Sequence, residues 1–476
     1  MPDMPDQHPV RIGTDEITTT EPSVVSSPYD GHEVARVPTC DASHVERAVA
    51  AASDAMADPL PPWRRAEILD AAARAVADHR DELATIIAEE SAKPITTART
   101  EAERAVLTFQ SAAVEARTLT GEVVPVDGAQ PGDGKLAFTL RVPRGVVAAI
   151  SPFNFPLNLV AHKLAPAIAA GCAVVLKPAG QTPMSAIRLH EILMDECGLP
   201  PGWINVITGS GATIGDPLVE HPDVAVVTFT GSPDVGWAIA AKAARKKVGL
   251  ELGNNAPLIV DASGDWEQAA TKVSVAGYSH AGQSCISTQR VYVHASLADR
   301  FTDALVAKVE ALVVGDPQGE DTDVSALIST KETERVKDWI DDAAREGATI
   351  ATGGGQQDRL LAPTVLTGIT PGMEVSRNEV FGPVVGIAAF DQLSEAIALA
   401  NDTRYGLQAA IFTSELDGAL RAAHELDFGG VLVNEVPTFR TDQMPYGGVG
   451  DSGNTKEGPH YAVREMTQER LVVIQR

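Results

Sequence analysis

Cys285 is the best candidate for a nucleophile in this sequence. It lies in the small, polar stretch Gly282-Gln-Ser-Cys-Ile-Ser287, which follows a helix predicted over residues 266–280. A thiol at such a junction between a loop and a helix can be exposed, and nearby amide N–H groups can favour its thiolate. A cysteine without such a setting is usually a small buried side chain. That is our interpretation of the other three, Cys40, Cys172 and Cys197.

Two acidic residues could supply acid–base chemistry or bind hydroxyl groups. Glu251 ends a predicted strand, Lys247–Glu251, and active groups of open α/β sheets gather beyond the carboxyl ends of their strands. Glu379 lies in Asn378-Glu-Val-Phe-Gly-Pro383 and is a similar candidate. The plainer alternatives are a solvated carboxylate at a strand end for Glu251 and a turn residue for Glu379.

Two further stretches at strand ends could hold an anionic ligand. Phe229-Thr-Gly-Ser232 is a strand that enters a glycine turn and then a helix, a geometry that points backbone N–H groups at an anion. Lys177 follows the strand predicted over Ala173–Leu176. It would suit hydroxyls or phosphates at the same sheet edge, although a solvent-facing lysine is the commoner outcome. Neither stretch is specific alone, because neither contains a GxGxxG motif or the GK[ST] of a P-loop.

A first set of elements positions these residues. From Arg144 to Glu251 short apolar strands alternate with helices, which predicts parallel strands with right-handed crossovers and an open α/β sheet. The predicted strands are Val146–Ile150, Ala173–Leu176, Ile204–Ile207, Val224–Phe229 and Lys247–Glu251, and the predicted helices are Pro156–Ala170, Ser185–Cys197, one from near Ile214, and Pro233–Ala244.

A second alternation, from Leu258 to Asn434, predicts a second α/β domain. Residues 1–42 are expected to form short strands, 42–118 helices, 121–142 two strands about a turn, and 470–475 a last strand. In the second domain the predicted strands are Leu258–Val260, Arg290–His294, Val384–Phe390, Ala409–Phe412 and Gly430–Asn434, and the predicted helices cover 266–280, 297–313, 331–346, 394–400 and 415–425.

The composition excludes several classes of function. The chain has 38 basic and 64 acidic residues, a net charge of −26, and no basic cluster, so nucleic acid is not an expected partner. Its 4 cysteines are too few for a disulfide framework in so long a chain, and because no two have CxxC spacing, neither a zinc site nor another metal is expected. The N-terminus lacks the features of a signal peptide, and no stretch of about 18 apolar residues occurs. We therefore predict a cytoplasmic protein with no membrane partner.

Taken together, the motifs of this sequence resemble those of one family. The series is similar to that of the aldehyde dehydrogenase superfamily, and the similarity extends from about Pro22 to the C-terminus. In chain order the motifs are Pro152-Phe-Asn-Phe-Pro156, Lys177-Pro178, Phe229-Thr-Gly-Ser232, Glu251-Leu-Gly253, Gly282-Gln-Ser-Cys285, Glu379-Val-Phe-Gly-Pro383, Asn401-Asp-Thr-Arg-Tyr-Gly-Leu407 and Pro445-Tyr-Gly-Gly448.

The resemblance implies an α/β fold of three parts: a Rossmann-like NAD(P)-binding domain, a second α/β catalytic domain and a small β oligomerisation element. We expect residues 1–120 and 143–252 to form the cofactor domain, 253–453 the catalytic domain, and 121–142 with 454–476 the oligomerisation element. The last element lacks a core of its own, so a homodimer or homotetramer is expected.

The resemblance also implies oxidation of an aldehyde to a carboxylic acid. Cys285 would attack the aldehyde as thiolate, and the side-chain amide of Asn154 with the backbone N–H of Cys285 would stabilise the oxyanion of the thiohemiacetal. Hydride transfer to the nicotinamide would leave a thioester, and Glu251 would activate water for its hydrolysis. Lys177 completes the expected catalytic set.

The expected cofactor is NAD or NADP. Lys177 and Glu379 would hold its ribose hydroxyls, and Phe381 would touch the nicotinamide ribose. Many NAD-preferring relatives carry glutamate at the position of Gly180, where it would repel a 2′-phosphate. Its absence leaves NADP open, with NAD slightly favoured. The full expected set is Ile150, Ser151, Pro152, Lys177, Ala179, Gly180, Gly211, Gly215, Thr230, Gly231, Ser232, Val235, Leu252, Glu379 and Phe381.

The expected substrate is a small polar aldehyde, such as lactaldehyde, glyceraldehyde or a semialdehyde. Arg104 and Arg440 stand where the family often lines its substrate entrance, and the motif around Arg104 looks most like that of a lactaldehyde-type branch. His162 lies eight residues beyond Asn154, so both can face one side of a helix. Ser284 stands where relatives that act on phosphorylated aldehydes tend to carry arginine, which counts against a phosphorylated substrate.

Two alternatives to this activity stay open. Relatives that pass the acyl group to coenzyme A generally lack a glutamate at the position of Glu251, so its presence favours water as acceptor without excluding coenzyme A. The other alternative is a catalytically silent scaffold on the same fold.

Overall fold

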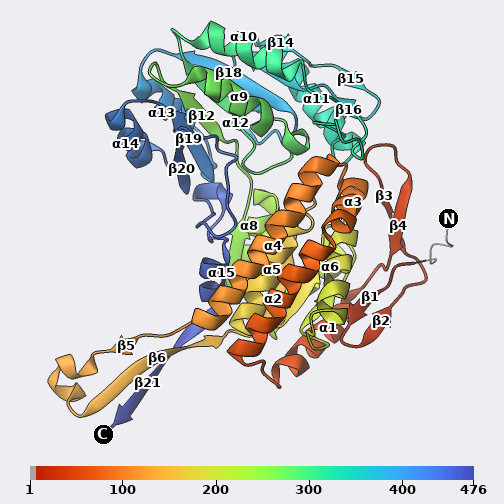
Figure 1. The fold of residues 1–476 in the computed structure, drawn as a ribbon, viewed down its shortest axis with the longest axis vertical. Helices are drawn as coiled ribbons and strands as arrows, with labels where there is room; N and C mark the ends of the chain where they lie inside the picture. The colour runs from red at the N-terminus through yellow and green to blue at the C-terminus, as the bar shows by residue number, and fades with distance from the viewer. Residues whose placement is uncertain (1–6) are drawn as a thin grey trace.

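Two sheets form the framework of the structure, which is a computed structural model that describes residues 7–476 (Figure 1). The first has five strands in the order β11-β10-β7-β8-β9, all parallel. This order, with a helix between successive strands, confirms the predicted open α/β sheet. Its strands are β7 (Val146–Ile150), β8 (Val174–Lys177), β9 (Ile204–Val206), β10 (Val224–Thr230) and β11 (Lys247–Glu251).

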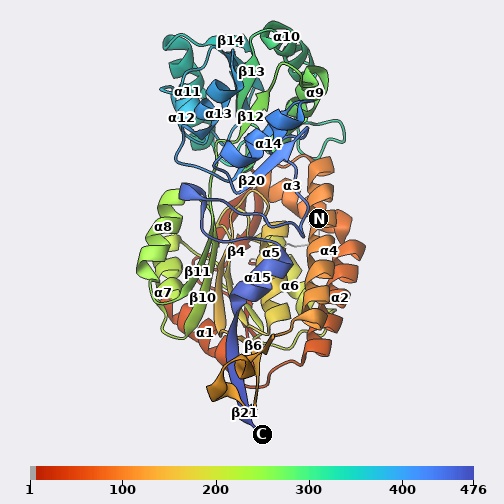
Figure 2. The ribbon, with the colours of Figure 1, turned by 90° about the vertical axis from the view of Figure 1, so that its left-hand side faces the viewer.

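Helices cover both faces of this sheet. Figure 2 shows α7 and α8 on one side of the strands and α5 on the other, with α2 and α4 in a further layer. The long helix α4 packs on α2, α3 and α5, and α1 contacts β7, β8 and β9. The helices are α1 (Ala42–Met56), α2 (Pro62–Asp78), α3 (Arg80–Ser91), α4 (Ile95–Thr118), α5 (Asn158–Ala170), α6 (Met184–Asp195), α7 (Asp216–Glu220) and α8 (Pro233–Lys242).

Two small hairpins precede these helices. They lie within residues 10–37, where short strands were predicted. Both pairs are antiparallel. The hairpin strands are β1 (Val10–Ile12), β2 (Asp15–Ile17), β3 (Ser23–Ser26) and β4 (Glu33–Val37).

The second sheet has seven strands in the order β14-β17-β18-β13-β12-β19-β20. Strand β14 runs antiparallel to β17, and the other neighbours are parallel. The strands β14 and β17 were not predicted, because they are short and rich in threonine, which weakens the apolar pattern. The strands are β12 (Pro257–Val260), β13 (Arg290–His294), β14 (Thr349–Thr352), β17 (Thr364–Thr367), β18 (Val384–Phe390), β19 (Gln408–Phe412) and β20 (Gly430–Val433).

Successive side chains of the central strands enter two different cores. Leu258 and Val260 of β12 pack in one buried cluster, whereas Ile259 packs in another on the opposite face. A strand buried on both faces carries a continuous apolar run, which is why β12 was recognisable from sequence. The helices of this unit are α9 (Trp266–Ala276), α10 (Ala298–Val309), α11 (Thr330–Arg345), α12 (Glu374–Arg377), α13 (Leu393–Asn401) and α14 (Leu416–Glu425), and a small hairpin joins β15 (Gln356–Gln357) to β16 (Leu360–Leu361).

A three-stranded antiparallel sheet projects from the body as an arm (Figure 1). It consists of β5 (Val123–Val124), β6 (Lys135–Pro143) and β21 (Thr467–Gln475). The helix α15 (Pro459–Met466) before β21 packs instead against α4 and α5 of the body. The domain boundaries predicted at 120/121, 142/143, 252/253 and 453/454 stay predictions.

Within residues 7–476, every helix is too short or too polar to cross a lipid bilayer.

Candidate active site

The carboxyl ends of the first sheet bring several predicted residues to one edge. The register pairs Ile150 of β7 with Lys177 of β8, and Thr230 of β10 with Glu251 of β11. Phe229 pairs with Ile150, so these strands end at the same level. Lys177 is the last residue of β8 itself and is buried, in contrast to the solvent-facing alternative.

A cavity of about 650 Å³ opens beyond this edge. Two glycines leave it room, since a Cβ at Gly180 or Gly211 would meet no atom within 4 Å. The cavity wall combines backbone of glycine turns with apolar side chains such as Ile239. Of the residues expected to bind the cofactor, this cavity is lined by Ile150, Ser151, Lys177, Ala179, Gly180, Gly211, Gly215 and Val235.

A second cavity of about 810 Å³ adjoins the first and shares part of its wall, including Phe229 and Gln181. It lies between the two units, because Glu251 comes from the first sheet whereas Cys285 and Glu379 come from the second unit. It brings together three of the four predicted catalytic residues, all but Lys177, with the remaining cofactor residues: Pro152, Asn154, Thr230, Gly231, Ser232, Glu251, Leu252, Cys285, Glu379 and Phe381.

One side of this second cavity was not predicted from the sequence. Glu332, Arg335 and Trp339 line it from α11. Their spacing of three and four residues places them on one helix face, so the predicted helix could have indicated that these three side chains lie together. Arg404 and Tyr405 also line it; they belong to a motif that supported the family resemblance, but no role was assigned to them.

Cys285 differs from the expected exposed thiol at a helix junction. The preceding helix α9 ends at Ala276, and His280 and Ala281 adopt left-handed backbone angles before Gly282. Cys285 then lies in a turn, with no helix following before β13. Its Sγ is 2.7 Å from the hydroxyl of Tyr446. Burial raises the pKa of Cys285 to about 12, and the hydrogen bond with Tyr446 partly opposes this effect.

Asn154 is positioned directly beside the Cys285 turn. Its side-chain Nδ2 donates a hydrogen bond of 2.9 Å to the carbonyl oxygen of Gln283, and the side chain is buried. The second N–H of the amide is left as a donor. Because α5 begins only at Asn158, Asn154 precedes the helix, and the predicted sharing of one helix face with His162 was wrong.

Glu251 is a buried carboxyl group, and within residues 7–476 neither of its oxygens has a hydrogen-bond partner. Burial holds the pKa of Glu251 well above its usual range, and the nearby Glu457 adds to this. Arg440 and Lys163 act in the opposite direction. A carboxylate with a raised pKa is a stronger base than a free one, which suits it to accept a proton from water.

Lys177 and Glu379 face the cavities from opposite units. Burial lowers the pKa of Lys177, whose Nζ lies 3.3 Å from the carbonyl oxygen of Pro178. Glu379 accepts a hydrogen bond of 2.9 Å from the backbone N–H of Asn254, and burial raises its pKa to about 7. Next to it, Phe381 has a left-handed backbone with φ of 49°, and its ring packs edge-on against that of Phe153 at 5.8 Å.

The two adjoining cavities fit a dinucleotide. Side chains at Gly180 and Gly211 would project into open space, so the backbone can approach a bulky ligand closely there. The α8 N-terminus after Ser232 offers backbone N–H groups to a diphosphate. Lys177 supplies an ammonium donor and Glu379 a carboxylate acceptor at these cavities, and their contacts with ribose hydroxyls stay a prediction.

Three residues expected in the substrate pocket form one buried polar network. Nη2 of Arg104 lies 2.8 Å from Oδ1 of Asp442, and Nε2 of His162 lies 2.9 Å from the same oxygen. His162 Nε2 is also 3.1 Å from Nη2 of Arg440, which pairs with Glu457 at 2.8 Å. Arg104 remains 23% exposed at its side chain, whereas His162 is fully buried.

The network pairs opposite charges, Arg104 with Asp442 and Arg440 with Glu457. Burial lowers the pKa of His162, which keeps its ring neutral at pH 7. Although burial raises the pKa of Asp442, hydrogen bonds from His162 and Arg104 hold it below its usual range. The network stands outside the lining of the 810 Å³ cavity and reaches Cys285 through Tyr446, over whose ring Arg440 lies at 3.9 Å. Ser284 also stands outside that lining.

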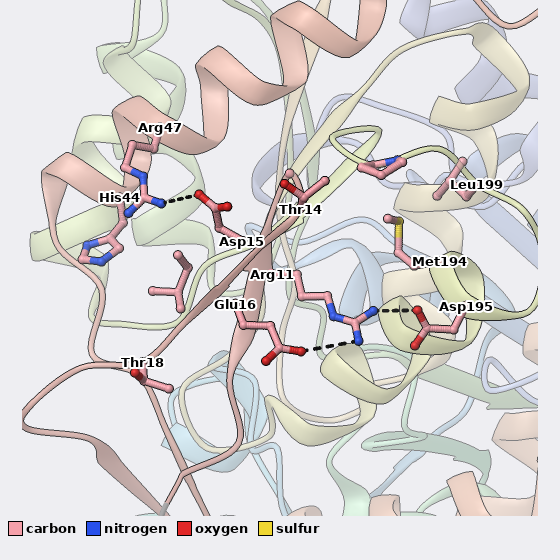
Figure 3. A pocket seen from close by; sticks show the side chains of 13 residues that line it. Arg11, Thr14, Asp15, Glu16, Thr18, His44, Arg47, Met194, Asp195 and Leu199 are labelled. Atoms are coloured by element: carbon pink, nitrogen blue, oxygen red, sulfur yellow. Dashed lines mark hydrogen bonds and ion pairs between the residues drawn. The ribbon is translucent and has the colours of Figure 1, made fainter.

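A separate concavity lies beside the N-terminal hairpin (Figure 3). Its charged side chains pair with one another: Arg11 with Asp195 at 2.7 Å and with Glu16 at 3.7 Å, and Arg47 with Asp15 at 3.0 Å. It contains none of the predicted site residues and is open to solvent, so we assign it no part in the chemistry.

Comparison with known proteins identifies the family to which the chain belongs. Residues 16–472 match the family described as the aldehyde dehydrogenase family. The chain belongs to the aldehyde dehydrogenase family. The resemblance inferred from the motifs is thereby confirmed, and so is the α/β fold class.

Three proteins illustrate how similar this aldehyde dehydrogenase is to known members of the family. It is 48% identical to a 3-sulfolactaldehyde dehydrogenase of Priestia megaterium over 457 residues, which covers 96% of each chain. It is 38% identical to a lactaldehyde dehydrogenase of Methanocaldococcus jannaschii over 455 residues, covering 94% of this chain and 96% of the relative. The crystal structure of an NADP-dependent glyceraldehyde-3-phosphate dehydrogenase of Bacillus halodurans, complexed with NADP, superposes with a TM-score of 0.96 at 37% identity, covering 98% and 99%.

The aldehyde dehydrogenase is therefore an enzyme that oxidises aldehydes with NAD or NADP, as predicted. A silent scaffold is no longer a competing reading, because the family, its named relatives and the converging site point to the same activity.

Proposed function

We propose that this aldehyde dehydrogenase oxidises a small polar aldehyde, with a hydroxyl or an anionic group near the carbonyl, to the free acid. The observation that carries the proposal is the network of Arg104, Asp442, His162 and Arg440 behind the nucleophile. Arg104, which keeps 23% of its side chain exposed, offers hydrogen-bond donors to a polar substrate, and its charge would be costly beside an apolar one. The relative named a 3-sulfolactaldehyde dehydrogenase supports a hydroxylated, anionic three-carbon substrate.

The catalytic residues each have a chemical task in this proposal. When bound, the nicotinamide cofactor accepts the hydride of the substrate. Cys285 attacks the aldehyde carbon as thiolate, and the free N–H of the Asn154 amide stabilises the oxyanion with the backbone N–H of Cys285. Glu251 lines the same cavity and, in its ionised form, accepts a proton from the water that hydrolyses the thioester.

Water is the proposed acyl acceptor. Glu251 lines the cavity of Cys285, and within residues 7–476 neither of its carboxyl oxygens has a hydrogen-bond partner, which supports a free acceptor for a proton from water. Transfer to coenzyme A remains the second candidate. It would require turnover to depend on added coenzyme A, so formation of the free acid without coenzyme A decides between them.

Either nicotinamide cofactor fits the proposed site. Gly180 places no carboxylate at the position where a 2′-phosphate would be repelled, and open space faces it. The slight preference for NAD expected from sequence stays a proposal, to be tested by comparing kcat/KM with NAD and NADP at 340 nm.

The substrate proposal predicts a specific effect of Arg104→Leu. Loss of the guanidinium should lower kcat/KM for hydroxylated, anionic aldehydes about 10- to 100-fold, because a hydrogen bond to a charged group is lost. Propanal, which makes no such bond, should be oxidised at nearly the unchanged rate. The measurement is cofactor reduction across a panel of aldehydes that differ in charge, hydroxylation and chain length.

Arg99 provides the matched control for Arg104. It lies on the same helix, α4, and pairs at the surface with Glu320, so Arg99→Leu should leave the panel unchanged. Long apolar aldehydes as the best substrates, with no effect of Arg104→Leu, would rule out a polar substrate.

We also propose that the arm makes the enzyme a homodimer or homotetramer. Its apolar side chains are unusually exposed, with Val123 at 77%, Leu471 at 57% and Val473 at 48%. Exposed apolar side chains on a projecting sheet are typical of a surface covered by another subunit.

Lysine at both Leu471 and Val473 should dissociate the oligomer. The two residues share one face of β21, so two charges would be buried in the interface. Sedimentation velocity should show the mass of a single chain, whereas Val275→Lys, at an exposed apolar position on α9, should keep the parent mass. A wild-type monomer would contradict the proposal outright.

A reducing, cytoplasmic location is a further proposal. Cys40, Cys172, Cys197 and Cys285 are all free thiols, which supports a compartment where disulfides do not form.

A further inference from the structure

Tyr446 is the only side chain with a hydrogen bond to the Cys285 sulfur within residues 7–476, and the mechanism above gives it no role. Its hydroxyl lies 2.7 Å from Sγ. The ring is 2% exposed and packs in a small apolar cluster with Ile286 and Leu407. The contact joins residues 161 positions apart, so it depends on how the C-terminal loop is placed against the Cys285 turn.

Several contacts fix the position of the Tyr446 ring. Its backbone N–H donates to the carbonyl oxygen of Glu457 at 3.2 Å, and the N–H of Glu457 donates back at 2.5 Å. The guanidinium of Arg440 lies over the ring at 3.9 Å from its centroid and is itself held by the Glu457 carboxylate at 2.8 Å. A cation over the ring face draws electron density from the phenol and strengthens its O–H as a donor.

We propose that Tyr446 is a further catalytic residue, which stabilises the Cys285 thiolate by donating its phenolic hydrogen to Sγ. The proposal adds a hydrogen bond and no proton transfer. Cys285 gives its proton to solvent before attack, whereas Tyr446 keeps its own, because burial raises the pKa of Tyr446 well above 10. In the neutral thiol either atom can donate, but once the sulfur is ionised only the phenol can.

This hydrogen bond answers a specific problem of the site. Burial disfavours a negative sulfur at Cys285, and the nearby carboxyl groups of Glu379 and Glu251 disfavour it further. A donor that stays in place in the absence of substrate lowers the cost of ionisation, since it needs no reorganisation at the moment of reaction. The inference rests on the proposed role of Cys285 as nucleophile.

The test replaces Tyr446 with phenylalanine and follows the thiol directly. Phenylalanine keeps the ring that packs on Ile286 and Leu407 and removes only the hydroxyl. The rate of alkylation of Cys285 by iodoacetamide is measured against pH by mass spectrometry, in enzyme without added cofactor or aldehyde. Cys285→Ala gives the background from the other cysteines, and thermal melting confirms that each variant is folded.

The apparent pKa of Cys285 should rise by one to two in Tyr446→Phe, and alkylation at pH 7 should slow about 10- to 100-fold. The kcat/KM for aldehyde oxidation should fall by a similar factor at every pH well below the pKa of Cys285. Tyr29→Phe, in the turn between β3 and β4, should match wild type in both measurements.

An unchanged alkylation profile overturns the inference, even if activity falls. A rise in KM alone, with kcat and alkylation intact, also overturns it, since the hydroxyl would then serve the substrate. These outcomes differ from a failure of the proposed function, which would show as aldehyde oxidation that survives Cys285→Ala.

Discussion

Replacing Cys285 with alanine is expected to abolish aldehyde oxidation, with a loss of kcat of about 10⁵-fold or more. No other thiol can substitute: Cys40, Cys172 and Cys197 are buried in the core of the first unit, away from the cavity that Cys285 lines. The assay is reduced cofactor at 340 nm with the best aldehyde of the panel.

Cofactor binding should survive this substitution. Cys285 lines the 810 Å³ cavity, whereas the residues around Gly180 and Gly211 line the adjoining 650 Å³ cavity. Trp339 lies in the cavity wall, so quenching of tryptophan fluorescence by NAD or NADP can measure affinity independently of turnover.

Cys197→Ala is the matched control for Cys285→Ala. Cys197 is a buried thiol beyond the end of α6, and its loss should leave kcat unchanged. Undiminished cofactor reduction by the Cys285→Ala enzyme would refute the covalent mechanism and with it the proposed function.

Replacing Glu251 with glutamine should separate the two halves of the reaction. Acylation of Cys285 does not need this base, so one reduced cofactor per active site should form in a rapid first phase. Hydrolysis of the thioester should then be slowed about 10²- to 10⁴-fold. Stopped-flow absorbance at 340 nm measures both phases, and intact-protein mass spectrometry detects the acyl group on Cys285.

The pH dependence of this hydrolysis follows from the raised pKa of Glu251. Only the ionised carboxylate can accept a proton from water, so the wild-type deacylation rate should rise with pH through that pKa and then level off. Glutamine does not ionise, so this rise should be absent in Glu251→Gln. Glu310→Gln, at the surface end of α10, should keep the wild-type profile.

The raised pKa of Glu251 also predicts how the stability of the folded enzyme depends on pH. The folded pKa of Glu251 is raised above the unfolded value near 4.5, so the folded state favours the protonated form. The contribution of Glu251 to stability is complete below pH 4.5 and is lost as pH rises through the folded pKa. At pH 8 the Glu251→Gln enzyme should therefore melt no lower than wild type.

The kinetic prediction for Glu251→Gln can fail in one clear way. Absence of the rapid first phase in this variant, with unchanged steady-state turnover, would show that another group activates water.

Much of the fold and site could be predicted because the relevant signals are local. The alternation of short apolar strands with helices predicts parallel strands, and parallel strands end at one edge. Ile150, Lys177, Thr230 and Glu251 could therefore be expected together before any contact was known, and the register places them there. Every residue expected to bind the cofactor lines one of the two adjoining cavities.

Local signals were misleading where the backbone departs from a regular pattern. The apolar periodicity after Trp266 continues past Ala276, but the helix ends there and His280 with Ala281 turns left-handed. The predicted helix over 266–280 was therefore too long. The predicted environment of Cys285, an exposed thiol at a junction with a helix, was wrong for the same reason, since its surroundings depend on that turn.

The sequence by itself determined the family, the order of strands and helices and the residues at the sheet edge, because these follow from patterns a few residues long. Only the tertiary structure decided which polar side chains meet. Arg104 and Asp442 are 338 positions apart, and Cys285 and Tyr446 are 161 apart. Such contacts depend on how segments far apart in the chain pack against one another, and no short-range preference of the chain encodes that packing.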